Sequence, residues 1–280
     1  MSRTNRSCAM LIAAICGLAA CTRDEALEPE AVTSSPTPAQ LALPAAVIAD
    51  LGEPMSPQDN PLTVQGIALG RKLFYEKALS DDFSMSCGSC HVQANAFSDP
   101  QPFSTGTDGS LGVRNSMSLV NLAWGDRMFW DGRVQGLEAQ AHDPVTNQVE
   151  LRNTWPVVEQ RLNASNEYPL LFRAAFGTDA IDSTLVTKAI AQFVRSVVSF
   201  DSPFDRYWYA GDSTAMSEEA RNGLSLFTSQ GKCAGCHDPG LFTDNAFRNN
   251  GLDLVFTDLG RGFITGNPAD EGKFKVQPVV

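Results

Sequence analysis

The stretch Cys87-Gly88-Ser89-Cys90-His91 has a second copy later in the chain, Cys233-Ala234-Gly235-Cys236-His237. Each copy has the C-x-x-C-H form in which two thiols attach covalently to haem and the adjacent histidine ligates its iron. A single copy would also fit half of a zinc or redox motif. Because the chain holds only three histidines and two of them complete this pattern, we predict two covalently bound c-type haems. The predicted attachment residues and iron ligands are Cys87, Cys90 and His91, and Cys233, Cys236 and His237.

A similar segment precedes each motif. Gly70-Arg71-Lys72-Leu73-Phe74 and Gly223-Leu224-Ser225-Leu226-Phe227 both place Leu three and Phe four residues after a glycine. A glycine permits close helix packing, and the Leu-Phe pair would cover a porphyrin, although this pattern alone is more often plain helix core. Paired twice with C-x-x-C-H, it predicts tandem cytochrome-c-like units. Strand signals are sparse, so the expected fold class is all-α with long loops.

Apolar spacing and capping signals predict several helices. One begins near Pro61, and others cover 155–163, 167–176 and 183–199. A further helix starts after Ser217, a candidate N-cap that two glutamates follow.

The N-terminus has the features of a secretory signal. Arg3 and Arg6 precede residues 10–20, an uncharged apolar run that is too short to span a bilayer. The run leads into Cys21 through Leu-Ala-Ala, which resembles the bacterial lipoprotein signal whose cysteine is acylated; the alternative is an ordinary cleavage site beside an incidental cysteine. Because Thr22 follows rather than Asp, we expect a periplasmic protein with a lipid anchor in the outer membrane.

The formal net charge of −11 argues against a nucleic-acid partner. An acidic surface is compatible with a small electron-donor protein that docks through a positive or apolar face, but it is also common in proteins without such a partner.

Over residues 61–276 the chain resembles the bacterial di-haem cytochrome c peroxidases and their methylamine-utilisation (MauG-like) relatives. Besides the two motifs, the residues that carry the resemblance are Leu73-Phe74, Ala96-Phe97-Ser98-Asp99, Arg114-Asn115-Ser116, Phe129-Trp130-Asp131-Gly132-Arg133, Gln140, Glu150 and Ser202-Pro203-Phe204-Asp205-Arg206-Tyr207. The resemblance implies a cytochrome-c peroxidase type oxidoreductase. Such an enzyme reduces hydrogen peroxide to water with electrons from a small cytochrome c or copper protein.

The resemblance also implies roles for single residues. The haem on His91 is expected to be the peroxidatic one, with Glu150 as acid–base group and Gln140 beside it in the distal pocket. Trp130 is expected to relay electrons between the haems, and Asn115 to be a calcium ligand. Alternatives from the residues alone are a solvent-facing glutamate and an ordinary core tryptophan. Arg114 is expected to pair with a haem propionate.

These features predict that the chain is divided into four segments. Residues 1–21 are expected to be a lipoprotein-type signal peptide, and 22–60, rich in Ala, Pro, Ser and Glu, a flexible tether. Residues 61–210 would form the N-terminal peroxidatic haem domain and 211–280 the C-terminal electron-transfer haem domain. A homodimer stays open as the oligomeric state.

The sequence departs from the family pattern in two places. The loop 92–113 contains no histidine to cap the first haem, so we expect an open site as in the MauG-like branch, with His142 exposed or hydrogen-bonded elsewhere. After His237 the chain contains no Met, His, Tyr or Cys to cap the second haem, so that unit is expected to be incomplete. The alternative functions are therefore a MauG-like oxidase of a protein or large substrate, and a non-catalytic di-haem electron carrier or inactive fragment.

Overall fold

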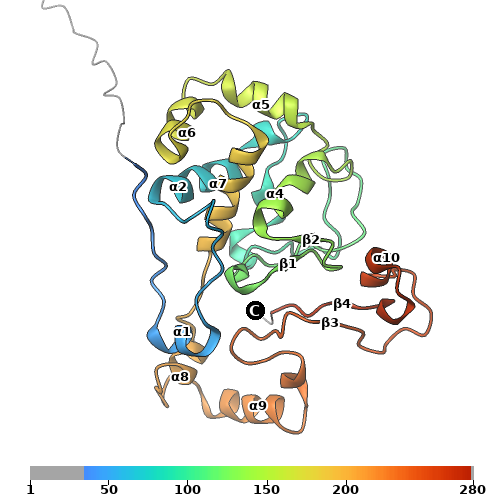
Figure 1. Ribbon diagram of the computed structural model, residues 1–280. Helices are drawn as coiled ribbons and strands as arrows, with labels where there is room; N and C mark the ends of the chain where they lie inside the picture. Colours follow the sequence, from blue (N-terminus) through green and yellow to red (C-terminus); the bar gives the residue numbers. More distant parts are fainter. Residues whose placement is uncertain (1–34, 279–280) are drawn as a thin grey trace, which may run out of the picture. The chain divides into compact units, whose positions relative to one another are not determined.

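The computed structural model describes residues 35–278. At its centre the helices α2 (Val64–Phe74) and α7 (Ser183–Ser196) pack against each other (Figure 1). A glycine permits this close approach, because a Cβ on Gly70 would lie 1.9 Å from the backbone oxygen of Ala189. Side chains cap both helices: Thr63 accepts from the N–H of Gly66, and Asp182 accepts from that of Leu185.

The fold is mostly helical, as expected, with a few very short strands. The other helices are α1 (Ala45–Leu51), α3 (Cys87–Cys90), α4 (Leu137–Thr146), α5 (Trp155–Asn163), α6 (Tyr168–Phe176), α8 (Pro203–Trp208), α9 (Glu218–Thr228) and α10 (Arg261–Thr265). Single 3₁₀ turns lie at Lys77–Leu79, Gln93–Asn95, Leu122–Trp124, Cys233–Gly235 and Pro268–Asp270. Two antiparallel strand pairs complete the described part, β1 (Arg127–Met128) with β2 (Val134–Gln135) and β3 (Phe247–Arg248) with β4 (Phe274–Lys275).

The helices expected from periodicity are confirmed. Those predicted over 155–163 and 167–176 are α5 and α6, while the one predicted over 183–199 ends earlier, as α7. Ser217 caps α9 as expected, because its side chain accepts a hydrogen bond from the N–H of Ala220. Helix α4 was not predicted. It contains Pro144 in its last turn, a residue that normally argues against a helix.

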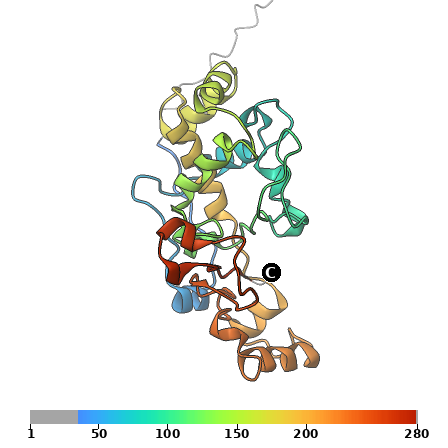
Figure 2. The same ribbon diagram turned by 90° about the vertical axis from the view of Figure 1, so that its right-hand side faces the viewer.

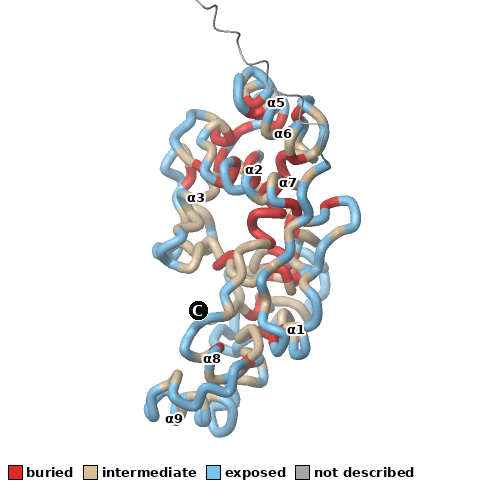
Figure 3. The backbone as a smooth tube through the Cα atoms, turned by 90° about the vertical axis from the view of Figure 1, so that its left-hand side faces the viewer, coloured by how far each residue is buried: buried red, intermediate tan, exposed pale blue. Residues whose placement is uncertain are grey.

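The hydrophobic core gathers around α2 and α7. Its fully buried members include Leu73, Phe74, Phe172 and Val186, and the buried segments cluster around these helices in Figure 3. In contrast, α9 buries no residue. The two segments with the Gly-x-x-Leu-Phe pattern therefore differ: the first is core and the second lies at the surface.

Residues 35–60 do not form the flexible tether that their composition suggested. Val47 of α1 is fully buried, and the N–H of Met55 donates to the oxygen of Ala123 at 2.8 Å. The buried amide of Asn60 donates to Glu138 Oε1 at 2.6 Å. The composition did not indicate this packing, because the contacts involve backbone groups and scattered side chains and leave no periodic pattern of apolar residues. The predicted signal, Cys21 and residues 22–34 lie outside the described residues.

The C-terminal segment, residues 247–278, lies beside the β1–β2 hairpin (Figures 1 and 2). The N–H of Lys275 in β4 donates to the oxygen of Trp130 at 2.8 Å, and Arg261 in α10 donates to the oxygen of Asp131 at 3.2 Å. Among the described helices, none combines the length and apolar character that crossing a membrane requires.

Candidate functional site

The first C-x-x-C-H motif folds into the single helical turn α3. The N–H of Ser86 donates to the hydroxyl of Ser89 at 3.0 Å, and the N–H of His91 donates to the oxygen of Cys87 at 2.9 Å. One turn of helix places residues three apart on the same face. Local structure therefore brings Cys87 and Cys90 to the wall of one pocket, with His91 beside them.

The two motifs share a local geometry around their histidines. Nδ1 of His91 donates to the oxygen of Phe97 at 2.9 Å, and Nδ1 of His237 donates to that of Phe242 at the same distance. Both phenylalanines have left-handed backbones, with φ of 57° and 53°. Because a carbonyl only accepts, each Nδ1 carries the proton and each Nε2 keeps its lone pair for a metal.

The aromatic rings around the histidines repeat as well. The ring of Phe74 lies 6.4 Å from that of His91 and 6.0 Å from that of Phe97. In the second copy, Phe227 lies 6.4 Å from His237 and 5.9 Å from Phe242, in the same order. The sequence repeat is therefore also a structural repeat at this level.

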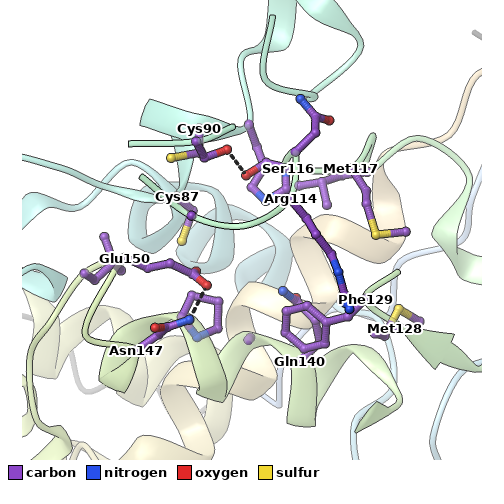
Figure 4. Close-up of a pocket in the computed structure, with 18 of the residues that line it drawn as sticks. Cys87, Cys90, Arg114, Ser116, Met117, Met128, Phe129, Gln140, Asn147 and Glu150 are labelled. Carbon is purple, nitrogen blue, oxygen red and sulfur yellow. Dashed lines mark hydrogen bonds between the residues drawn. The ribbon is translucent and has the colours of Figure 1, made fainter. Parts of the chain in front are cut away.

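A cavity of about 230 Å³ opens beside the first motif (Figure 4). Both cysteines, His91 and the predicted catalytic residues line it, and its wall is mainly apolar. Its lining includes Cys87, Cys90, His91, Arg114, Trp130, Arg133, Gln140, Glu150 and Lys275. The family resemblance implied a distal-pocket position for Gln140 and Glu150 and a position between the haems for Trp130. All three side chains line this cavity.

Burial keeps both thiols of the first motif neutral. It raises the pKa of Cys87 to about 12 and that of Cys90 to about 11, and nearby carboxylates add to the effect. Zinc binding and thiol redox chemistry need thiolates. Within residues 35–278, no cluster of three or more His, Cys, Asp or Glu side chains has the arrangement of a metal site.

The residues fit a haem. Two neutral thiols and a histidine share one mainly apolar cavity, and burial lowers the pKa of His91, which favours the neutral, ligating imidazole. In the second copy, Cys233 is exposed, and no residue of that motif lines this cavity.

Glu150 is held in place from several sides. Asn147 Nδ2 donates to Glu150 Oε1 at 2.6 Å, and the N–H of Thr107 donates to the Glu150 backbone oxygen at 3.1 Å. Burial raises the pKa of the carboxyl group, while the hydrogen bond from Asn147 and the positive charge of Arg133 oppose that rise. A partly buried carboxyl with a raised pKa suits proton transfer near neutral pH.

Trp130 lies in the turn of the β1–β2 hairpin. Its indole N–H donates to the oxygen of Asn115 at 2.8 Å, and its own oxygen accepts from the N–H of Lys275. The preceding residue, Phe129, has a left-handed φ of 66°. The guanidinium of Arg133 lies over the Phe129 ring, 3.4 Å from its centroid.

The structure adds two residues that sequence reasoning had not placed in the pocket, Arg133 and Lys275. For Arg133, the only signal was its position in the Phe-Trp-Asp-Gly-Arg stretch. Lys275 lies in 272–276, which resembles the start of the family's C-terminal stretch, but no local pattern assigned it to this cavity, because it reaches the cavity from far along the chain.

Asn115 also lines the cavity, where its backbone oxygen accepts from Trp130, whereas His142 lies outside the cavity lining. The side-chain amide of Asn115 donates to the oxygens of Asp99 at 2.8 Å and Gln101 at 2.6 Å, and its calcium role stays a prediction. His142 is exposed, as expected, and its ring centroid lies 5.0 Å from that of Trp155.

Comparison with known proteins identifies the family. A family model described as di-haem cytochrome c peroxidase matches residues 64–214. The methylamine utilization protein MauG of Methylorubrum extorquens is 42% identical over 207 residues, which is 74% of this chain and 58% of the relative. Cytochrome c551 peroxidase of Pseudomonas aeruginosa is 33% identical over 228 residues, which is 78% of this chain and 65% of the relative.

A solved structure agrees with these relatives. A MauG-like protein associated with microbial copper homeostasis superposes with a TM-score of 0.79 at 30% identity, covering 86% of this chain and 75% of that one. The chain spans less than two thirds of the length of either curated relative. It belongs to the di-haem cytochrome c peroxidase family.

Proposed function

We propose that this protein is a di-haem peroxidase that reduces hydrogen peroxide to water. In this proposal c-type haems are attached at Cys87 and Cys90 and at Cys233 and Cys236, in tandem cytochrome-c-like units over 61–210 and 211–280. The observation that carries the proposal is that Glu150 and Gln140 line the same cavity as the first haem motif.

Bound haem would supply the iron at which peroxide binds and is reduced. The protein would have to move one proton from one peroxide oxygen to the other, which leaves as water. Glu150 can do this through its free Oε2, because Asn147 occupies Oε1. The amide of Gln140, on α4, can orient peroxide by hydrogen bonding. The apolar wall limits access of bulk water to the proton transfer.

Two electrons and two protons complete the reduction of one peroxide to two waters. We propose that a small cytochrome c or copper protein supplies these electrons to the haem on His237, and that Trp130 relays them. The support is the place of Trp130 on the pocket wall, with its indole held by Asn115 and its backbone by the C-terminal segment.

The remaining proposals rest on sequence features. They are a periplasmic location, a lipid anchor on Cys21 and a calcium ion at Asn115. Metabolic labelling with a radioactive fatty acid would test the anchor, since Cys21→Ala should abolish the label.

The second candidate function is a MauG-like oxidase that uses the same site to oxidise a protein or other large substrate. The absence of histidine from the loop 92–113 and the similarity to MauG favour it. Steady turnover of peroxide with reduced cytochrome c would support the peroxidase. Stable storage of oxidising equivalents without a small donor would support the oxidase.

The central test is Glu150→Gln in the haem-loaded protein. We expect the peroxide reaction, followed by stopped-flow absorbance, to slow about 100- to 10,000-fold, because the amide cannot shuttle a proton. Thermal stability should not fall, since Asn147 still donates to the amide oxygen and no charge is buried. The control is Glu53→Gln at an exposed site, which should react like the wild type. Normal rates in Glu150→Gln would sink the proposal.

A further inference from the structure

The cations that line the cavity differ in how their charge is balanced. Arg114 pairs with Asp131 at 2.6 Å and with Asp258 at 2.8 Å. Arg133 pairs with Asp131 at 3.3 Å and with Asp143 at 3.7 Å, so its charge is also balanced within the protein. Among the described residues, Lys275 is the cavity-lining cation that forms no ion pair with a carboxylate.

Lys275 is also deeply buried, with 4% of its surface exposed. Its ammonium donates one hydrogen bond, to the oxygen of Arg127 at 2.7 Å, and an ammonium has three donors. Burial lowers its pKa to about 8, and the charge of Asp126 opposes this only in part. A buried cation without a counter-charge costs free energy unless an anion is supplied.

We propose that Lys275 is the counter-charge for an anionic group of the cofactor in this cavity, a haem propionate. The inference rests on the proposed haem at Cys87, Cys90 and His91. The family resemblance implied that Arg114 pairs with a propionate. We assign that pairing to Lys275 instead, because the guanidinium of Arg114 already donates to Asp131 and Asp258. A propionate supplies both the negative charge and the acceptor oxygens that the ammonium lacks.

A functional consequence follows for the first haem. Lys275 belongs to β4, far along the chain from the motif whose cavity it lines. A positive charge near a haem favours the reduced over the oxidised iron, so it raises the midpoint potential. The C-terminal segment would thus set the potential of the haem on His91.

The test uses the protein with both haems attached. Lys275→Gln removes the charge but keeps a donor for the oxygen of Arg127. We expect the midpoint potential of the haem on His91 to fall, that of the haem on His237 to stay, and the propionate bending mode in resonance Raman spectra to shift. Lys275→Arg should restore the potential. The control is Lys273→Gln, which removes a lysine that pairs with Asp270 at 3.0 Å, and it should change neither reading.

An unchanged potential with an unchanged propionate mode overturns the inference, and so does a shift confined to the haem on His237. If Lys275→Gln does not load haem, Lys275→Arg provides the test, because it changes the position of the charged hydrogen-bond donor. A shifted propionate mode in Lys275→Arg then supports the inference. An unchanged mode refutes it. These readings are independent of turnover. If the wild type does not react with peroxide but Lys275→Gln shifts the potential of the haem on His91, the proposed function is rejected and this inference stands.

Discussion

At the scale of the residue, the environment of Glu150 predicts how the peroxide reaction depends on pH. The carboxyl group must be ionised to take a proton, and burial raises its pKa. We therefore expect the rate constant to fall as the pH drops through this raised pKa. Because the charge of Arg133 lowers the pKa and that of Asp143 raises it, Arg133→Gln should move the midpoint to higher pH and Asp143→Asn to lower pH.

Stopped-flow rates over a pH series measure these midpoints. Arg133→Lys is the control, since it keeps the charge while losing the planar contact with Phe129, and it should leave the midpoint nearer to that of the wild type. Shifts of the same sign in Arg133→Gln and Asp143→Asn would contradict the electrostatic explanation.

At the scale of the element, the two repeated helices contain glycines with opposite roles. A Cβ on Gly70 of α2 would meet the backbone of α7, whereas one on Gly223 of α9 would meet nothing within 4 Å. We expect Gly70→Ala to lower the free energy of unfolding by about 1–3 kcal/mol through overpacking. Gly223→Ala should raise it by about 1 kcal/mol, because alanine is the better helix former.

Chemical denaturation of the two variants measures both effects. Since the glycines occupy matching positions of the sequence repeat, each variant serves as the control for the other. Equal changes in the free energy of unfolding would show that α2 and α9 have similar surroundings in solution. That result would contradict the difference in burial between the two helices.

At the scale of the whole molecule, Arg114 joins segments that are far apart in the sequence. It donates to Asp131 beside Trp130 and to both oxygens of Asp258 in the C-terminal segment. Arg114 and Asp258 are partly exposed, with 21% and 39% of their side chains accessible. We expect Asp258→Asn to cost about 1–2 kcal/mol, between the usual values for exposed and buried ion pairs.

Hydrogen exchange should locate this loss. Amides of 127–133 and 273–276 should exchange faster in Asp258→Asn, because the hairpin and β4 hold each other near Trp130. The control Asp179→Asn breaks an exposed pair with Arg173 and should leave these amides unchanged. The effect should also appear in the wild type in acid, since Arg114 lowers the pKa of Asp258 and the stabilisation is lost as the pH falls through that lowered value.

Much of the site was predictable because its parts are local. The motif geometry needs one helical turn, so Cys87, Cys90 and His91 follow directly from five adjacent residues. The helices α5, α6, α7 and α9 follow from apolar spacing and capping over short windows. Glu150, Gln140 and Trp130 needed the family pattern, since nothing in their immediate sequence separates a pocket residue from a surface or core one.

The sequence by itself determined the two C-x-x-C-H motifs, the helical class and the internal repeat, because motif spacing and helix periodicity depend on neighbours in the chain. Only the tertiary structure decided that residues 35–60 pack on the body and that α2 is core while α9 is not. It also decided which cations of the cavity are neutralised and that Lys275 reaches it. Burial and ion pairing depend on residues more than a hundred positions apart, and no local pattern records those distances.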